Sequence, residues 1–412
     1  MKKINLLLFI LLIQTALIAG GGSVYSRYGL GDFRYSFSAR RIGLGELGYS
    51  ISDREFISTL NPASWNNLGL TRFETGVFVN AMNYESSQNS VFKSTAYFNG
   101  LVFGFPISKE NGISFVTGLT PYSNVSYEIL SSDKNDLVPD HTVTYIGEGG
   151  IQKLFFGSSL RLPYNFSVGA SFDYYMGEIS NNTDILFHDT LGYHNSTFKR
   201  QFSYHGIGFT AGLISPDISK LFGESEFKEL HFGFSVSPQL NLTADSSSTN
   251  VSLIGTYTAS SGTITGKLPL RFGFGTSFKF TDNYLFTFDY LIHKMSRFEF
   301  GNIKSNNLQD VSKFSFGIEY HPTAKFNDYW SLIMLRGGFS FEKTPYIFNG
   351  ESINQLSLYA GCSLPLSYEN SLDIAFQYAK RGTTNKNLIL ENIYRLTFSL
   401  SLGEIWFIQV ER

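Results

Sequence analysis

Two histidines lie close to serines in the sequence, and a serine with a neighbouring histidine base could carry out hydrolysis. The two segments are "HFGFS", with His231 and Ser235, and "HKMS", with His293 and Ser296. On an extended strand His231 and Ser235 are about 13 Å apart, which is too far for direct proton transfer. His293 and Ser296 would face opposite sides of a strand. The sequence also has no Gly-x-Ser-x-Gly elbow and no cluster of metal ligands, so we expect no enzyme, no metal and no other cofactor.

Arg40 and Arg41 are the other residues to which the sequence gives a chemical role. Arginine binds carboxylates through two parallel hydrogen bonds, so this pair could contact the carboxylate of a substrate. Alternatively, the two side chains could form salt bridges to acidic residues within the protein and hold their own segment in place. If the chain forms a barrel, we expect the second role, because charged side chains inside a barrel usually pair with one another.

Aromatic residues and glycine are abundant in this chain of 412 residues, which has 40 Phe, 24 Tyr and 39 Gly but only 16% charged residues. The formal net charge of -2 indicates no nucleic-acid partner. Beyond residue 19, no apolar segment is long enough to span a membrane as a helix. This composition fits a membrane β-barrel, in which aromatic side chains mark both interfaces.

The first residues have the layout of a secretory signal peptide. Lys2 and Lys3 precede an apolar run from Ile4 to Ala19, and small residues follow. We therefore expect residues 1–22 to direct export and to be removed. Together with the composition, this predicts a location in the outer membrane of a Gram-negative bacterium, in contact with the lipid bilayer and lipopolysaccharide.

Large apolar residues alternate with small or polar ones through most of the chain, which is typical of strands. Around residue 375, one face carries Leu372, Ile374, Phe376 and Tyr378, and the other carries Asp373, Ala375 and Gln377. Segments of this kind number about fourteen between residues 70 and 402, and single-chain bacterial barrels have an even number of strands. Residues 249–266 could be a loop or another hairpin, and we expect outer loops near 181–195, 244–250 and 300–309. The predicted fold class is an all-β, transmembrane antiparallel barrel of about fourteen strands.

Residues 23–69 lack this alternation and precede the first strand. They are rich in glycine and charged residues, and Asn61 before Pro62 favours a turn. A barrel of about fourteen strands has a wide lumen that needs either an open pore or a plug. We therefore predict an N-terminal plug, or hatch, at 23–69 inside a barrel formed by 70–412.

The run "GLGELGYSISDREFISTLNPASWNNL", residues 43–68, resembles the hatch of the FadL family of outer-membrane transporters. That hatch has a Gly-rich start, an acidic residue and an Asn-Pro-Ala signature, matched here by Asn61, Pro62 and Ala63. The resemblance implies a fourteen-stranded barrel with a hatch, and transport of long-chain fatty acids or other hydrophobic compounds. The usual carboxy-terminal aromatic residue is absent, since "IQVER" follows Trp406 and Phe407.

The third predicted strand, Gly112 to Ile129, contains Gly118 and Pro121. Proline cannot donate a hydrogen bond to a neighbouring strand and marks edges or bulges. Pro121 could mark an inward kink and a lateral opening in the wall, or it could begin an outer loop. The resemblance favours a lateral gate at Gly118 and Pro121, because it implies an exit at a kink of the third strand.

These features predict passive uptake of a hydrophobic small molecule, which binds in an apolar lumen pocket and leaves sideways into lipid. The alternative is an outer-membrane docking or assembly component for exported proteins, with such a protein as its partner.

Overall fold

The computed structural model describes residues 21–404, except 136–137, 189–192, 223–225, 302, 323–328 and 368. Residues 1–20 of the expected signal peptide, and Trp406 and Phe407, lie outside the described residues. Among the described residues, no helix has the length and apolar character needed to cross a membrane.

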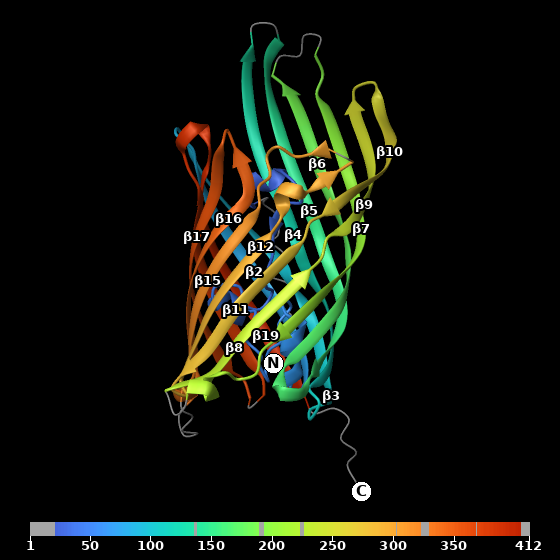
Figure 1. The fold of residues 1–412 in the computed structure, drawn as a ribbon. Helices are drawn as coiled ribbons and strands as arrows, with labels where there is room; N and C mark the ends of the chain where they lie inside the picture. The colour runs from blue at the N-terminus through green and yellow to red at the C-terminus, as the bar shows by residue number, and fades with distance from the viewer. Residues whose placement is uncertain are drawn as a thin grey trace, which may run out of the picture.

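Fourteen antiparallel wall strands form a closed barrel (Figure 1). The wall consists of β2 (Thr71–Glu85), β3 (Ser90–Ser108), β4 (Ile113–Asn135), β5 (Val138–Arg161), β6 (Ser167–Phe187), β7 (Ser196–Ile214), β8 (Phe227–Ser237) continued by β9 (Leu240–Ser252), β10 (Gly255–Leu268) continued by β11 (Arg271–Phe280), β12 (Tyr284–His293), β15 (Val311–Tyr320), β16 (Met334–Phe348), β17 (Glu351–Pro365), β18 (Ser371–Gly382) and β19 (Leu390–Glu404). The ladder between β19 and β2 closes the barrel. The predicted fold class is confirmed.

Two wall strands are each interrupted by a proline. β8 and β9 both pair with β7, and they are separated at Pro238. On the next strand, β10 and β11 are separated at Pro269, opposite the first interruption. Because proline has no N–H to donate, each strand loses its regular ladder at this level and resumes beyond it.

The outer ends of the wall differ in height. Figure 1 shows β4, β5, β6, β7, β9 and β10 rising above the remaining strands, and we call this raised part the outer wall. The outer loop expected near 181–195 is wrong for residues 181–187, which belong to β6, and the one expected near 244–250 is wrong because these residues belong to β9. Residues 249–266 likewise form the end of β9 and most of β10. These residues are rich in Ser and Thr, so their sequence lacks the apolar alternation that would indicate strands continuing beyond the apolar band.

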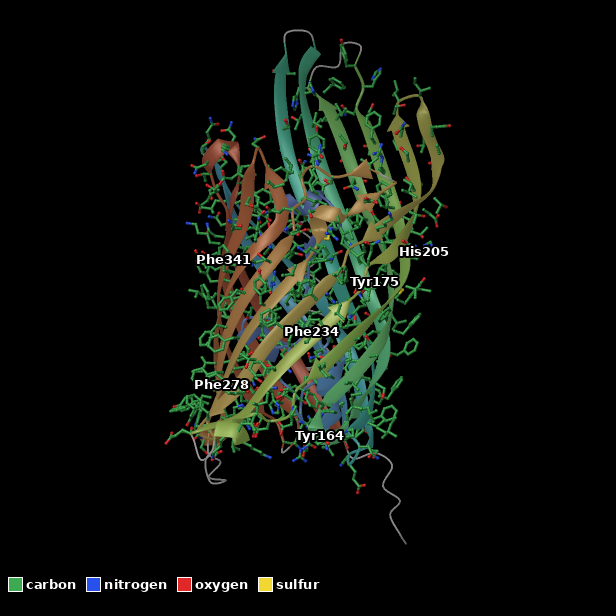
Figure 2. The ribbon with its side chains drawn as sticks, in the orientation of Figure 1. Tyr164, Tyr175, His205, Phe234, Phe278 and Phe341 are labelled. Atoms are coloured by element: carbon green, nitrogen blue, oxygen red, sulfur yellow. The ribbon has the colours of Figure 1, made fainter. Side chains whose placement is uncertain are left out.

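The apolar face of the strands points outward and the polar face points into the lumen. On β18, Phe376 is 44% exposed, whereas Asp373 and Gln377 are 1% and 2% exposed. On β15, Phe314 is 42% exposed, whereas Lys313 is fully buried. A water-soluble sheet has the opposite arrangement, so this wall is built to face lipid. Figure 2 shows side chains projecting from the wall around the barrel, with Phe234, Phe278 and Phe341 labelled.

The segment before β2 lies inside the barrel as an irregular hatch. It contains η1 (Val24–Arg27), β1 (Asp32–Phe33), α2 (Ala39–Gly43) and η2 (Pro62–Asn67). The remaining short elements connect wall strands: η3 (Pro163–Asn165), η4 (Ser219–Phe222), η5 (Met295–Arg297), β13 (Glu299–Phe300), β14 (Ile303–Lys304), η6 (Tyr329–Leu332) and η7 (Asn385–Asn387). The hatch buries Leu44, Leu47 and Trp65 almost completely, so its own apolar side chains form much of the core.

We predict that Phe376→Lys destabilises the barrel in lipid by about 2–4 kcal/mol, because it places a charge on the lipid-facing surface. The free energy of unfolding, measured by urea titration in lipid vesicles, tests this. Phe376→Leu is the matched control and should change little. An unchanged stability of the Lys variant would contradict the outward orientation of the apolar face.

Candidate functional site

Arg40 and Arg41 project from the short helix α2, whose N-cap Ser38 accepts a hydrogen bond from the Arg41 backbone N–H at 3.4 Å. The Arg40 guanidinium donates two bonds to Glu319 of β15, at 2.8 and 2.7 Å, and also pairs with Asp53 of the hatch. Arg41 pairs with the same Asp53 carboxylate at 2.9 Å. Both guanidinium groups are thus engaged by carboxylates of the chain, and a contact with a substrate carboxylate stays a prediction.

Further ion pairs join the hatch to the wall. Glu319 also pairs with Arg336 of β16, so one lumen carboxylate lies between two guanidinium groups. Lys313 of β15 pairs with Glu46 of the hatch, and it pairs with Glu342 of β16 at 3.2 Å. The hatch therefore supplies charges of both signs to the inward-facing charges of the wall.

The Asn61-Pro62-Ala63 signature forms a corner that lies directly against the wall. The Asn61 side chain accepts a bond from the Ala63 backbone N–H at 3.1 Å and caps η2. Its amide nitrogen donates to the Tyr49 carbonyl at 2.6 Å and to the Leu213 carbonyl of β7 at 3.3 Å. These bonds tie the corner both to the rest of the hatch and to the barrel.

Two paired glycines of the wall make room for this corner. Gly169 of β6 and Gly212 of β7 lie opposite each other in the ladder. A Cβ atom at Gly212 would lie 1.8 Å from the Asn61 side-chain oxygen, and one at Gly169 would lie 2.4 Å from the carbonyl carbon of Pro62. Only glycine at both positions allows the corner to approach the strands this closely.

The ladder between β3 and β4 is short. It has seven residue pairs, from Ser108 opposite Ile113 up to Leu101 opposite Leu119, whereas the ladder between β4 and β5 has twenty. Beyond Leu101 and Leu119, the ladder pairs of β3 are with β2, and β3 is joined to β4 by an ion pair between Lys93 and Glu128. We call this separation of β3 from β4 the break.

Gly118 and Pro121 lie at the lower edge of the break. Gly118 pairs with Val102 just below the last pair of the ladder, and Pro121 lies just above it. Between Pro121 and Ser123 the register with β5 shifts, which leaves Tyr122 in a bulge. Pro121 remains within β4, so it does not begin an outer loop. A Cβ atom at Gly118 would lie 2.8 Å from the Leu101 carbonyl oxygen, so a larger residue there would disturb the ladder itself.

The first part of the hatch occupies the break. β1 pairs with β4 through Asp32 opposite Asn124 and Phe33 opposite Ser123. The Ser26 hydroxyl accepts from the Ser126 N–H at 3.2 Å and donates to the Ser126 carbonyl at 3.3 Å. On the other side, Asn99 of β3 donates to a carbonyl of the hatch, that of Phe37. Residues 26–37 thus take the place of the missing partner strand.

Several hollows adjoin the hatch. A cavity of about 20 Å³ lies beside Pro121 and is also bordered by Arg34, Tyr122, Lys153 and Arg271. At the end of the barrel with the short turns, a polar hollow of about 700 Å³ is lined in part by Arg54, Lys109 and Arg161.

Two more hollows lie at the outer mouth, against the inner face of the outer wall. One, of about 420 Å³, is lined largely by aromatic and aliphatic side chains, and the other, of about 610 Å³, is lined largely by polar ones.

The histidine and serine pairs do not form catalytic dyads. His231 contacts the Ser215 carbonyl at 3.0 Å, while the Ser235 hydroxyl donates to the Leu60 carbonyl at 2.7 Å. His293 is fully buried against Phe33, and the Ser296 hydroxyl bonds to Asp310. The described part of the chain contains no group of three or more His, Cys, Asp or Glu residues that could hold a metal.

The sequence matches the model of one protein family, BamG, over residues 1–411. The chain belongs to the BamG family. A search of curated proteins finds no match.

Solved structures with a fold similar to that of this BamG family member include two toluene transporters and a FadL homologue. The toluene transporter TbuX of Ralstonia pickettii has a TM-score of 0.63 at 17% identity, covering 90% of this chain and 99% of that one. A FadL homologue of Pseudomonas aeruginosa has a TM-score of 0.57 at 11% identity, covering 90% and 97%. The toluene transporter TodX of Pseudomonas putida has a TM-score of 0.55 at 17% identity, covering 91% and 99%. At these low identities the similarity is evidence for the fold alone. The fold implied by the resemblance to the FadL family is confirmed.

The sequence indicated the hatch corner and the proline of the third strand, but not the wall residues that contact the hatch. Gly169, Gly212, Glu319 and Ser126 are each at least sixty residues from their hatch contacts. Glycine and polar residues on the inward face of a strand are common in any barrel with a polar interior. Their pattern therefore does not distinguish those that touch the hatch.

We predict that Gly212→Ala loosens the hatch, because the added methyl group overlaps the Asn61 side chain. Overpacking of this kind costs about 1–3 kcal/mol, so the unfolding temperature should fall and protease cleavage within residues 23–69 should accelerate. Gly337→Ala is the matched control, since its Cβ would have no neighbour closer than 3.6 Å. If both variants behave like the unmodified protein, the corner is not seated as described.

Proposed function

We propose that this protein is a passive channel for hydrophobic compounds in an outer membrane. A compound binds at the aromatic hollow of the outer mouth, passes along the hatch, and leaves through the wall between β3 and β4. In this proposal residues 1–22 are the signal peptide, 23–69 the hatch and 70–412 the barrel.

The break between β3 and β4 is the observation that carries the proposal. Unpaired backbone groups are unfavourable in hydrocarbon unless something else satisfies them. Here the partner is part of the hatch, held by two ladder pairs at β1, by the bonds between Ser26 and Ser126, and by the ion pair between Asp32 and Arg381 of β18. If this segment withdraws, the wall opens sideways at Gly118 and Pro121, which we propose as the lateral gate.

Opening is required, because the cavity beside Pro121 is far smaller than any substrate. At about 20 Å³ it has room for roughly one water molecule. The solved structures with a similar fold include transporters of toluene, which is a hydrophobic compound. Burial of apolar surface, at about 25 cal/mol per Å², would favour both binding and departure into lipid.

Long-chain fatty acids are one substrate class that fits the lining near the gate. Arg34, Lys153 and Arg271 border the small cavity, and the nearest paired carboxylate is Asp173, 3.7 Å from the Lys153 ammonium group. Asp32 and Glu46 also lie close enough to Arg34 to interact with it, so an anionic head group would compete with these carboxylates for the three cations.

A disulfide between Ser26→Cys and Ser126→Cys, introduced into a Cys362→Ala background, should stop transport by holding the hatch in the break. Uptake of a radiolabelled long-chain fatty acid by cells should fall to the level of cells without the barrel, and a reductant should restore it. The control disulfide, Ala39→Cys with Ser399→Cys, joins α2 to β19 away from the break, where the Ala39 N–H already meets the Ser399 hydroxyl at 2.9 Å. Equal uptake with both disulfides oxidised would refute an exit at the break.

Docking of an exported protein is the second candidate function. The tip of the β9–β10 hairpin exposes Leu253 and Ile254, which are 72% and 100% exposed. Apolar side chains at a raised tip suit contact with another protein. Purification from the native membrane separates the two functions: an enriched lipophile supports transport, whereas a stoichiometric protein with no lipophile supports docking.

A further inference from the structure

The two hollows at the outer mouth form one continuous surface with two different linings. Arg27, Asn181 and Phe202 border both of them. Arg27 belongs to the hatch, Asn181 to β6 and Phe202 to β7, and Phe202 pairs with Ile179 across the two strands. A single ligand can therefore contact both linings at once.

The polar half offers positive charge, amide groups and hydroxyl groups. Arg200 lies on β7 between Asn181 of β6 and Ser248 of β9, with which it pairs in the ladders. Arg27 lies over the Tyr145 ring at 4.4 Å. The Asn181 side-chain oxygen accepts from the Tyr127 hydroxyl at 2.8 Å, which turns the amide nitrogen away from Tyr127.

These positive charges are not neutralised locally. In the part of the chain that the structure describes, no Asp or Glu lines either hollow, and neither Arg27 nor Arg200 forms an ion pair. Guanidinium groups beside amides and hydroxyls match a ligand that carries both an anion and several hydroxyl groups.

The other half is aromatic. Phe202 meets Phe300 edge to face at 5.7 Å between ring centroids, and Tyr204 lies 5.8 Å from the same ring. Ile179 and Phe298 complete this side and are 4% and 6% exposed. Such a surface binds an acyl chain or a ring by removing it from water.

We propose that the outer mouth binds an amphiphile whose anionic head is a hydroxyl-rich group, such as a phosphorylated or carboxylated polyol, attached to an apolar tail. The head contacts Arg27, Arg200 and Asn181, and the tail lies against Phe202 and Phe300. This inference rests on the proposed transport function and names a class of substrate for it.

The sizes and linings of the two halves distinguish this class from simpler ones. A neutral hydrocarbon would use only the aromatic hollow of about 420 Å³ and would leave the arginines without a partner. A bare carboxylate can be satisfied by one guanidinium group, and most of the polar hollow of about 610 Å³ would remain filled with water. A polyol anion uses the charges, the amides and the volume together.

Native mass spectrometry of the full barrel with an equimolar mixture of three lauroyl compounds tests this. Lauroyl lysophosphatidylglycerol has an anionic polyol head, laurate has a small anionic head, and lauroylglycerol has a neutral hydroxyl head on the same tail. We expect the lysolipid to be bound in preference to the other two. Arg27→Gln and Arg200→Gln should each lower its bound fraction about tenfold and leave lauroylglycerol unchanged. Phe202→Ala should weaken all three.

Lys343→Gln is the matched control, because it removes a positive charge from the outer face of β16 and should have no effect. Glycerol 3-phosphate, a head without a tail, should bind far more weakly than the lysolipid, and equal binding would overturn the role of the aromatic half. If laurate competes equally and the arginine variants change nothing, the proposed head group is wrong while transport stands. If no compound binds and none is taken up by cells, the transport function itself fails.

Discussion

The structure depends on one constraint: a charged side chain that is buried in the lumen needs a partner of opposite charge. The carboxylate of Glu319 meets it by lying between Arg40 of the hatch and Arg336 of the wall. Lipid outside the barrel requires apolar side chains on the outer face, so strand alternation directs the polar ones inward. Charges directed inward lose water as soon as the lumen is filled, and then they need partners. The hatch provides these partners, with Arg40 for Glu319 and Glu46 for Lys313. Wall and hatch are therefore two parts of one electrostatic arrangement.

Glycine meets a second requirement of the same arrangement, because ion pairs can form only where the backbones come close. Gly317 and Gly338 lie opposite each other on β15 and β16, two positions along from Glu319 and Arg336. A Cβ atom at either would collide with Leu44 or Gly45 of the hatch, at 2.5 Å. The pair at Gly169 and Gly212 has the same role under the Asn61 corner. Paired glycines thus hold the hatch at two separate places on the wall, which gives the abundant glycine of the sequence a specific use.

The sequence was sufficient for the number of strands, because the period of two survives wherever one face meets lipid. It was insufficient for the outer wall, because residues 250–258, at the ends of β9 and β10, are exposed on both faces and their apolar residues do not alternate regularly. The interruptions at Pro238 and Pro269 also break the alternation of apolar residues along their strands. For the candidate site, Asn61 and Pro121 were detectable through local chain chemistry, whereas the glycines and acids that contact the hatch depend on pairings distant in the sequence. The roles of the site residues in transport remain proposals.

The two parts of the hatch are held to the wall by different sets of contacts, and this difference bears on how a plugged barrel could open. Residues 39–61 are fixed by buried ion pairs, and wall glycines let their backbone approach the strands closely. Breaking one of these ion pairs would leave a buried charge without its partner. Residues 26–37 combine backbone hydrogen bonds along the unpaired edge of β4, at β1 and at Ser126, with side-chain contacts to the wall. Backbone groups of this kind can exchange their partners for water from the outer mouth at modest net cost, about 0.5–1.5 kcal/mol per bond. Asp32 pairs with Arg381 of β18 at 2.8 Å and accepts a hydrogen bond from the Tyr346 hydroxyl of β16 at 2.9 Å. Opening at the break, as proposed, would therefore also require the loss of the Asp32–Arg381 pair, after which Arg381 would keep Glu391 as a partner at 3.6 Å.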